Sequence, residues 1–261
     1  LFQPVRLVPD RGLGAPVLFF VECVEPGHVV EELVGLGEER DRQAAVGRVR
    51  DVRVARRTPD EVAGGGRPLF VFEAAFEDGV GEQVFDERVS IHADPWDENV
   101  PVVPWDADGG GGLAREKHTI INKGKVEWLQ YSRFWAKEKG KREYGTPGNL
   151  IMAGGDKTTD ELVKSTQKGV LVSRTRYIRM VDPQTVLLTG LTRDGTFYIE
   201  NGEIKYPIKN FRFNESPVIM LNNVEELGKP VRLTGDESPF LMMMPPMKLR
   251  DFTFTSLSDA V

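Results

Sequence analysis

GVLVSRTRYIRMVDPQTVLLTGLTRDGTFYIENGEIKYPIKNFRF, residues 169 to 213, is the longest stretch of the chain that keeps one regular pattern. Apolar and polar residues alternate through most of it, which is typical of β-strands with one buried face. The dipeptides Asp182-Pro183, Asp194-Gly195 and Asn201-Gly202 interrupt the alternation, and dipeptides of this kind favour tight turns. We therefore expect a β-meander with turns at these three positions.

Strand signals also occur on both sides of the meander. Val89 to His92 predicts a strand, and the stretch from His118 to Tyr131 predicts a hairpin with its turn at Asn122 to Gly124. FTFTSL, residues 252 to 257, predicts a last strand. The Pro-, Trp- and Gly-rich segment between the first two elements is too interrupted for regular structure.

Helix signals are few and short. Three helices are expected: one capped by Ser132, one that begins with the capping box Thr158 to Glu161 and stops at Gly169, and one over Pro217 to Leu227. In the last of these, Val218, Leu221 and Val224 would share the buried side. The sequence thus predicts an α+β fold that is predominantly antiparallel β with a few short helices.

The composition excludes several classes of protein. The chain has 261 residues, 40% of them hydrophobic, which is enough to bury a sizeable core. No apolar run approaches the roughly 20 residues of a spanning helix, and no secretory signal begins the chain, so we expect no membrane role. A net charge of -6 argues against general nucleic-acid binding, and the single cysteine, Cys23, is consistent with a cytoplasmic protein. Because position 1 is Leu1, we expect the native N-terminus to be missing.

A sharp change in composition divides the chain. Residues 1–80 contain no Ser, Lys, Ile, Asn, Tyr, Met or Trp, whereas all seven types occur from residue 81 onward. Most of the missing types share codons that begin with A, so the bias follows nucleotide phase. We therefore expect two parts, a compositionally anomalous segment 1–80 that a frameshift could explain, and a domain over 81–261; a genuine domain of skewed composition is the other interpretation.

Candidate catalytic residues are scarce. CVEPGHVVEE, residues 23 to 32, places His28 in an acidic run, but no second His lies one helical turn away, as a helical zinc site requires. His92 and His118 lie in predicted strands, where a structural role is favoured. We predict no catalytic, cofactor-binding or metal-binding residue in this chain.

For three further patterns we prefer a structural explanation to a functional one. Gly109 to Gly112 lacks the Gly-Lys-Ser/Thr ending of a phosphate-binding loop and indicates a loop tip, and Met242 to Met247 indicates a packed or peptide-facing loop. Aromatic and basic residues interleave from Trp128 to Arg142, which we interpret as a solvated helix end rather than a nucleic-acid contact.

One group of charges lies inside the meander. Arg174, Arg176 and Arg179 alternate with Thr175 and with apolar residues, so Arg174 and Arg176 would share one strand face, opposite Tyr177. They could line a polar groove, pair with acids or be solvated, and a solvated face is the default.

The sequence resembles the TldD/PmbA family, also called the modulator of DNA gyrase family. The stretches that carry the resemblance are VGEQVFDERVSIHADP, HTIINKGKVEWLQYSRFWAKEKG with TPGN, the meander with its extension NESP, and MKLRDFTFTSLSDAV. They run from Val80 to Val261, which corresponds to the family's C-terminal domain. The family groups metallopeptidase subunits with their non-catalytic partners.

The resemblance implies a peptide-cleaving chamber shared between two related subunits. Catalytic members carry an H-E-x-x-x-H helix and a late Cys as zinc ligands. Here Cys23 falls at the first His position and Val24 at the Glu position before His28, and no Cys follows Cys23. The chain therefore resembles the PmbA-like subunit, and zinc is expected in a catalytic partner rather than here.

Three functions follow from this resemblance. The leading one is a non-catalytic partner that pairs with a TldD-like catalytic subunit or with itself and receives a peptide or unfolded polypeptide. The second is a zinc metallopeptidase whose metal motif is lost by truncation or frameshift. The third is a gyrase-modulating interaction protein without peptidase activity.

Overall fold

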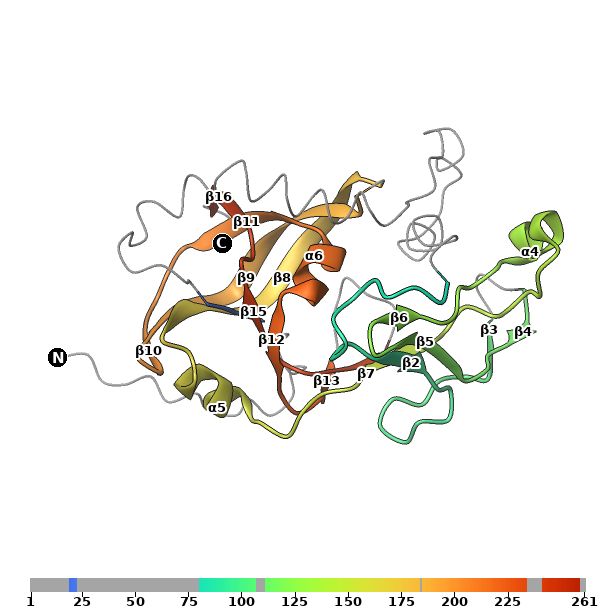
Figure 1. Ribbon diagram of the computed structural model, residues 1–261, viewed down its shortest axis with the longest axis horizontal. Coiled ribbons are helices and arrows are strands. Elements are labelled where there is room, and N and C mark those ends of the chain that lie inside the picture. Colours follow the sequence, from blue (N-terminus) through green and yellow to red (C-terminus); the bar gives the residue numbers. More distant parts are fainter. Residues whose placement is uncertain (1–18, 23–79, 107–110, 184, 234–240, 259–261) are drawn as a thin grey trace.

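The described residues form two main β-sheets that lie side by side, with a two-stranded ribbon and short helices at their margins (Figure 1). The computed structural model describes the backbone of residues 19–22 and the residues 80–106, 111–183, 185–233 and 241–258. Within these ranges most strand pairs are antiparallel, and the pairs β1 with β15 and β14 with β7 are parallel. The predicted α+β class with a predominance of antiparallel strands is confirmed.

The larger sheet has eight strands and is built around the predicted meander. Its order is β12-β15-β1-β8-β9-β11-β16, and β10 pairs separately with β9. The strands are β1 (Phe19–Glu22), β8 (Lys168–Asp182), β9 (Leu187–Glu200), β10 (Glu203–Pro207), β11 (Asn210–Glu215), β12 (Val224–Leu227), β15 (Met247–Arg250) and β16 (Phe254–Ser258).

The smaller sheet has six strands in the order β13-β14-β7-β2-β5-β6, and a two-stranded ribbon lies beside it. Its strands are β13 (Val231–Leu233), β14 (Leu241–Met244), β7 (Asn149–Met152), β2 (Ile91–Ala93), β5 (His118–Asn122) and β6 (Lys125–Val126); the ribbon is β3 (Trp105–Asp106) with β4 (Leu113–Ala114). The predicted hairpin is therefore present as β5–β6. Lys123 and Gly124 form its turn with positive φ angles of 46° and 79°.

One predicted turn is wrong. Asp194 and Gly195 lie inside β9, where their positive φ angles of 59° and 131° form a bulge instead of a hairpin. Val172 pairs with Thr196 and Arg174 with Arg193, so β9 contributes one extra residue between these pairs. The turn at Asn201-Gly202 is confirmed, because both residues have positive φ and connect β9 to β10.

Two of the three predicted helices end earlier than expected. Helix α4 (Arg133–Lys139) is capped by Ser132, as predicted. Helix α5 (Thr159–Lys164) has the predicted capping box but ends at Lys164, since Lys168 and Gly169 already pair with β9. Helix α6 (Pro217–Asn222) buries Val218 and Leu221, whereas the expected third member, Val224, begins strand β12.

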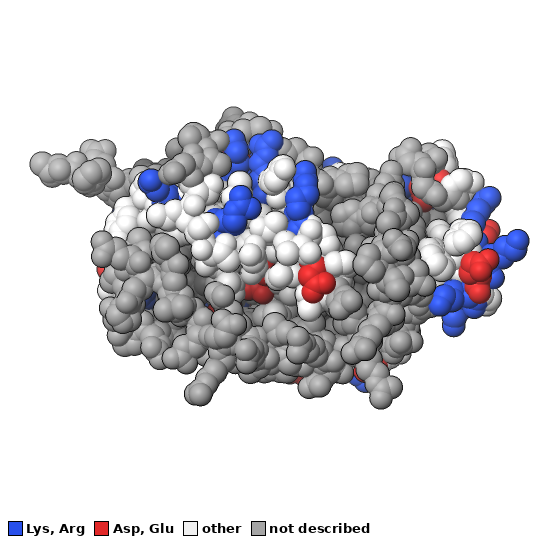
Figure 2. Space-filling model, turned by 90° about the horizontal axis from the view of Figure 1, so that it is seen from above, with Lys and Arg blue, Asp and Glu red and all other residues white. Residues whose placement is uncertain are grey.

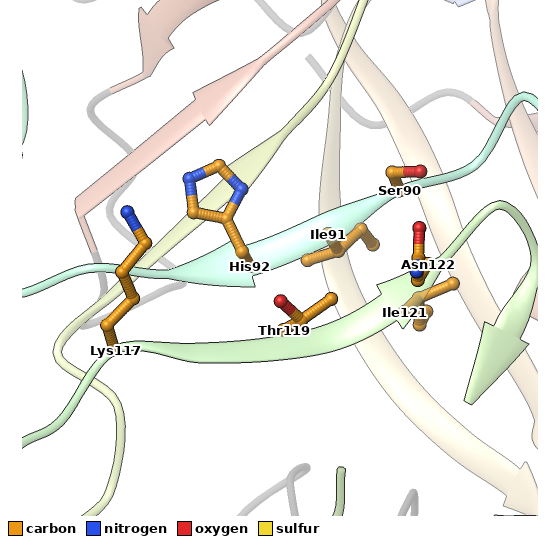
Figure 3. A pocket seen from close by; sticks show the side chains of 7 residues that line it. All are labelled: Ser90, Ile91, His92, Lys117, Thr119, Ile121 and Asn122. Atoms are coloured by element: carbon orange, nitrogen blue, oxygen red, sulfur yellow. The ribbon is translucent and has the colours of Figure 1, made fainter. Parts of the chain in front are cut away.

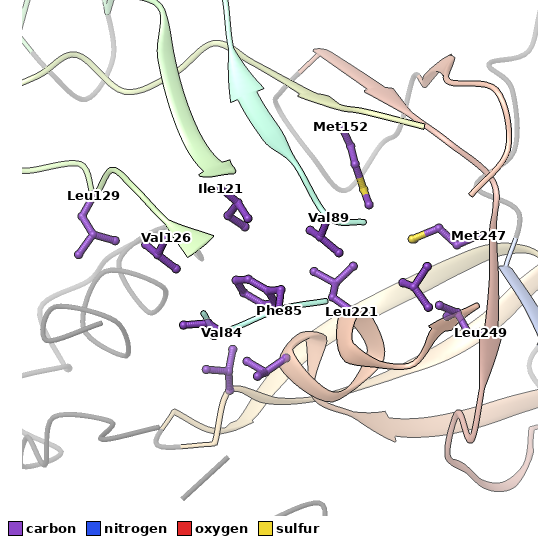
Figure 4. Packing of buried hydrophobic residues seen from close by; sticks show 13 residues of the cluster. Val84, Phe85, Val89, Ile121, Val126, Leu129, Met152, Leu221, Met247 and Leu249 are labelled. Atoms are coloured by element: carbon purple, nitrogen blue, oxygen red, sulfur yellow. The ribbon is translucent and has the colours of Figure 1, made fainter. Parts of the chain in front are cut away.

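Among the described residues, one hydrophobic cluster includes side chains of both sheets (Figure 4). Phe85, 2% exposed, lies at its centre, between Ile121 and Val126 of the smaller sheet and Leu221 of α6. Leu249 of β15 belongs to the same cluster and is fully buried. The two sheets therefore share a core, and the segment before β2 packs between them.

The Met-rich segment is more regular than expected. Met242 to Met244 belong to β14 and Met247 begins β15, with Pro245 and Pro246 between the strands. The segment therefore connects the two sheets rather than forming a loop. No helix among the described residues is long and apolar enough to cross a membrane.

Candidate functional site

A hollow lies over strands β2 and β5 of the smaller sheet (Figure 3). Its volume is about 260 Å³, and it is lined by Ser90, Ile91, His92, Lys117, Thr119, Ile121 and Asn122. Thr119 of β5 is the direct partner of His92 of β2, so its short side chain and the imidazole share one face of the strand pair. His92, one of the histidines considered from the sequence as a candidate site residue, lies in this hollow.

A cation and a neutral imidazole characterise this hollow. Lys117 Nζ lies 2.8 Å from Asp94 Oδ2, and this contact lowers the pKa of Asp94 and raises that of Lys117. Burial and, to a lesser extent, the Lys117 charge lower the pKa of His92 below its ordinary value of 6.5. The imidazole is therefore neutral near pH 7 and can exchange a hydrogen bond with a ligand, whereas the neighbouring Lys117 charge disfavours a metal cation beside it.

The hollow has no nucleophile arrangement among its described lining residues. Ser90 Oγ accepts a hydrogen bond from the backbone N–H of Lys123 at 2.9 Å, which holds the β5–β6 turn. This hydroxyl therefore has a structural role. A base oriented by a third group, as acyl-transfer chemistry needs, is not formed by these residues.

His118 lies in an aromatic cluster instead of a polar site. Its ring stacks on Trp128 with centroids 4.1 Å apart, and Tyr144 meets it edge-on at 4.9 Å. Burial lowers the pKa of His118. His118 Nε2 and Trp128 Nε1 are buried and lack a hydrogen-bond partner among the described residues. The predicted structural role of His118 agrees with this packing.

The two histidines point to opposite faces of their sheet. His92 pairs with Thr119 and Ala93 pairs with His118 across β2 and β5. Directly opposed residues share a face and successive residues alternate, so His92 and His118 lie on different sides. They cannot bind one metal ion together. Nor do any three His, Cys, Asp or Glu side chains within the described ranges converge as a metal group.

The donor set of the described part of the chain therefore does not fit the zinc site expected in catalytic members of the family. The other two residues considered as ligands, Cys23 and His28, lie outside the described residues. No step of a zinc mechanism is assigned to this chain.

The arginines of the meander lie on one face of the larger sheet. Arg174 is directly opposite Arg193, and Arg176 is opposite Leu191. Arg174 Nη1 binds Asp194 Oδ2 at 3.0 Å. As predicted, Arg174 and Arg176 share a face. Such a face is compatible with a solvated surface and with a ligand-binding surface.

Arg179 is separated from the other two by a bulge. Tyr177 has a positive φ of 57°, and the register shifts between Arg176 and Arg179. The guanidinium of Arg179 lies over the Tyr177 ring, 4.3 Å from its centroid. Simple alternation therefore does not describe this end of β8.

Two other sequence candidates have structural roles. Gly111 and Gly112 form the turn of the β3–β4 ribbon with positive φ angles, and Gly109 and Gly110 lie outside the described residues. The stretch from Trp128 to Arg142 contains α4, whose Phe134 is exposed and whose Ala136 is buried. Helix α4 thus has an exposed and a buried side, and the choice of a solvated helix end over a nucleic-acid contact stays a prediction.

Residues that the sequence patterns did not single out include Lys117 in the hollow and Arg193 and Arg212 beside the meander arginines. Lys117 follows a charged run and has no motif of its own. Arg193 and Arg212 join Arg174 and Arg176 only through strand pairing. The sequence predicted the strands of the meander, but the grouping of these arginines also depends on which residues pair between the strands.

Fold and site together define a β-rich domain whose two main sheets share a hydrophobic cluster. Residues 70–256 match the family described as the PmbA/TldA metallopeptidase C-terminal domain, which is more than half of the chain. The chain belongs to this family, and the resemblance found in its sequence is confirmed.

Known relatives agree with this assignment. The chain is 24% identical over 179 residues to metalloprotease PmbA of Escherichia coli O157:H7, an alignment that covers 66% of this chain and 38% of that protein. Its fold is similar to that of TldE from Thermococcus kodakarensis, with a TM-score of 0.60 and 15% identity over 94% of this chain and 51% of the other.

A second solved structure has the same fold. A protein described as a candidate modulator of a DNA gyrase, from Thermotoga maritima, has a TM-score of 0.57 and 18% identity, covering 70% of this chain and 42% of its own. The chain thus spans only 38% of the curated relative and about half or less of these two solved structures.

Proposed function

We propose that this chain is the non-catalytic partner in a peptide-cleaving assembly of the PmbA/TldA family. The observation that carries the proposal is the placement of His92 and His118 on opposite sheet faces, one beside Lys117 and the other stacked on Trp128. They are the only imidazoles in the family-matching stretch, which contains no cysteine. Two histidines on opposite faces, without a cysteine, do not supply the three protein ligands of a catalytic zinc ion.

The assembly would consist of this chain and a TldD-like zinc subunit, or of two copies of this chain. The bound zinc of a catalytic subunit would activate the water that cleaves a peptide or unfolded polypeptide. This chain would shape the chamber and hold the substrate, in the cytoplasm. The name of the Escherichia coli relative, a metalloprotease, supports a role in proteolysis.

Metal analysis tests the proposal directly. The purified full chain is dialysed against zinc and then against buffer, and its zinc content is measured by mass spectrometry. We expect well below one zinc ion per chain, and no change in the content of a His92→Gln variant. A stoichiometric zinc ion that is lost with that variant or with His118→Gln would overturn the proposal.

The assembly itself needs a second measurement. The chain is co-expressed with a TldD-like subunit from the same genome, and complex formation and cleavage of an unfolded polypeptide are followed. We expect cleavage only when the zinc subunit is present, and faster cleavage when both are. Equal cleavage by the zinc subunit alone would contradict a partner role for this chain.

One observation favours the second candidate, a metallopeptidase whose metal motif is lost by misreading. Seven residue types are absent from residues 1–80, the part of the chain that precedes the domain expected at 81–261. The nucleotide sequence of the gene decides between these functions. A corrected frame that encodes H-E-x-x-x-H upstream of residue 81 would establish the metallopeptidase, whereas one uniform codon phase would exclude the frameshift.

A further inference from the structure

Five arginines gather on one face of the larger sheet because of the strand register. Arg174 opposes Arg193 across β8 and β9, and two residues further along, Arg176, Leu191 and Arg212 form one row across β8, β9 and β11. Arg179 opposes Thr189, which lies on the same face as Leu191 two residues away. We call this surface the arginine face; it consists of Arg174, Arg176, Arg179, Arg193 and Arg212.

The opposite side of the same strands is buried and largely apolar. Phe213 and Thr192 alternate with the residues of the arginine face and are only 5% and 1% exposed. Phe211, Phe213 and Phe254 form a hydrophobic cluster there. The arginine side chains thus lie on the face opposite this packed face. Because the packed side chains fix the strands, the spacing between the arginines is fixed as well.

The arginine face has a high density of permanent positive charge. Asp194 is bound by Arg174 at 3.0 Å and lies 3.8 Å from Arg193, so these two guanidinium groups share one carboxylate. Arg212 is exposed, and its polar contact is a long one, 3.5 Å from Nη1 to Thr189 Oγ1. Arginine stays charged at any physiological pH and binds carboxylates through two parallel hydrogen bonds.

The surface view agrees with this grouping. In Figure 2, Lys and Arg side chains gather over the part of the molecule that holds the long strands in Figure 1, and acidic side chains are few beside them. A second group of Lys and Arg side chains lies at the far end of the molecule, where α4 is located, but there acidic side chains lie among them. The concentration over the long strands contrasts with the net charge of the whole chain, which is -6.

We propose that the arginine face binds an acidic peptide in an extended conformation. Arg174 and Arg176 are two residues apart on one strand, which corresponds to about 6.8 Å. Alternate side chains of an extended peptide have the same spacing, so Glu or Asp at every second position would meet successive arginines. The row of Arg176 and Arg212 on either side of Leu191 would bind carboxylates on both sides of the peptide.

The observations favour a peptide over a nucleic acid. A polynucleotide is attracted over long distances by a basic protein, whereas this chain is acidic overall and repels a polyanion beyond the local face. A peptide with a few carboxylates is sensitive mainly to the local charges within about 8–10 Å. This inference rests on the proposed function, since it names the class of peptide that the partner chain would hold.

Fluorescence anisotropy with the full chain tests the inference. The probes are a labelled peptide of alternating Glu and Thr, the same peptide with Gln in place of Glu, and a labelled single-stranded oligonucleotide of thymidines. The test variant is Arg176→Gln with Arg212→Gln. Its matched control is Lys125→Gln with Arg232→Gln, which removes the same charge from exposed positions on the smaller sheet.

We expect the Glu peptide to bind at least about tenfold more tightly than the Gln peptide, because several exposed charge pairs of about threefold each act together. The Arg176 and Arg212 double variant should lose about tenfold in affinity for the Glu peptide, and the control less than about twofold. Circular dichroism and thermal melting confirm folding of both variants. If the double variant is unfolded, single Arg212→Gln is used, with an expected loss of about threefold.

Equal affinity for the Glu and Gln peptides, or equal loss in the test and control variants, overturns the inference. Tighter binding of the oligonucleotide than of the Glu peptide, lost in the test variant, assigns the face to nucleic acid and also overturns it. The zinc measurement is independent of these outcomes. A chain that holds zinc but prefers the Glu peptide refutes only the non-catalytic role, and a zinc-free chain without the preference refutes only the acidic-peptide site.

Discussion

Truncation of Phe85 to alanine should destabilise both sheets together. Phe85 is 2% exposed and lies at the centre of the cluster that joins the smaller sheet to α6 and β15 (Figure 4). Removing a buried Phe side chain costs about 3–5 kcal/mol of unfolding free energy, through lost apolar burial and the cavity left behind. At about 2–4 °C per kcal/mol for a domain of this size, the melting temperature should decrease by about 6–20 °C.

The assay uses two signals that report on different sheets. All four tryptophans, Trp96, Trp105, Trp128 and Trp135, belong to the part of the chain around the smaller sheet, so their fluorescence follows that part. The larger sheet contains the two longest described strands, β8 of 15 residues and β9 of 14, so we use far-ultraviolet circular dichroism to follow this sheet. Both signals are recorded against guanidinium concentration for the original chain and for Phe85→Ala.

Coincident transitions that shift together are expected, since the cluster around Phe85 includes residues of both sheets. A Val103→Ala control at a side chain 52% exposed should shift them by less than about 0.5 kcal/mol. If the fluorescence transition of Phe85→Ala moves while the dichroism transition does not, the sheets unfold independently. The inference of a common core would then be refuted.

Three further predictions concern local structure and pH. Gly124→Ala should reduce the melting temperature more than Gly112→Ala, because both glycines have positive φ but only a Cβ at Gly124 would overlap the carbonyl oxygen of Phe85; equal reductions in thermal melts would contradict this. Burial lowers the pKa of His92 below 6.5, so the folded chain binds this proton less tightly than the unfolded chain; stability is full above that pH and decreases as the pH falls below it. Melts at about pH 7.5 and 5.5 should show a smaller loss for His92→Gln, and an unchanged loss would exclude this cause. Thr158→Ala removes the N-cap of α5 and should cost about 1 kcal/mol in guanidinium denaturation, whereas Thr159→Ala at the first helical position should cost less.

Local sequence signals predicted elements well where a short segment contains the whole cause. The capping box of Thr158 and Glu161 satisfies backbone donors within one turn, and the Asn201-Gly202 turn needs only two residues with positive φ. Asp194-Gly195 has the same local chemistry as Asn201-Gly202 but forms a bulge inside a strand instead of a turn. The partner strand β8 is 15 residues long and pairs with β9 on both sides of the dipeptide, so the chain continues and bulges.

The end of α6 illustrates the same limit. Val224 has the correct helical spacing from Val218 and Leu221, and the sequence therefore predicts one longer helix. In the structure Val224 pairs with Leu249 of β15, a residue far along the chain. A helix of low intrinsic stability yields to strand pairing that buries the same side chain, and no local pattern reveals that partner.

The chemistry of the candidate site depends on a bulge of one residue. Ile91 pairs with Ile121 but His92 pairs with Thr119, so Ile120 is an extra residue on β5. In a regular ladder His92 would oppose Ile120, and His118, two residues from Ile120, would lie on the same face as His92. The bulge reverses this relation: it directs His118 onto Trp128 and leaves His92 in the hollow with Lys117. Two histidines that a regular sheet would have placed side by side as potential ligands are thus separated by the sheet itself, a separation that the sequence pattern alone does not contain.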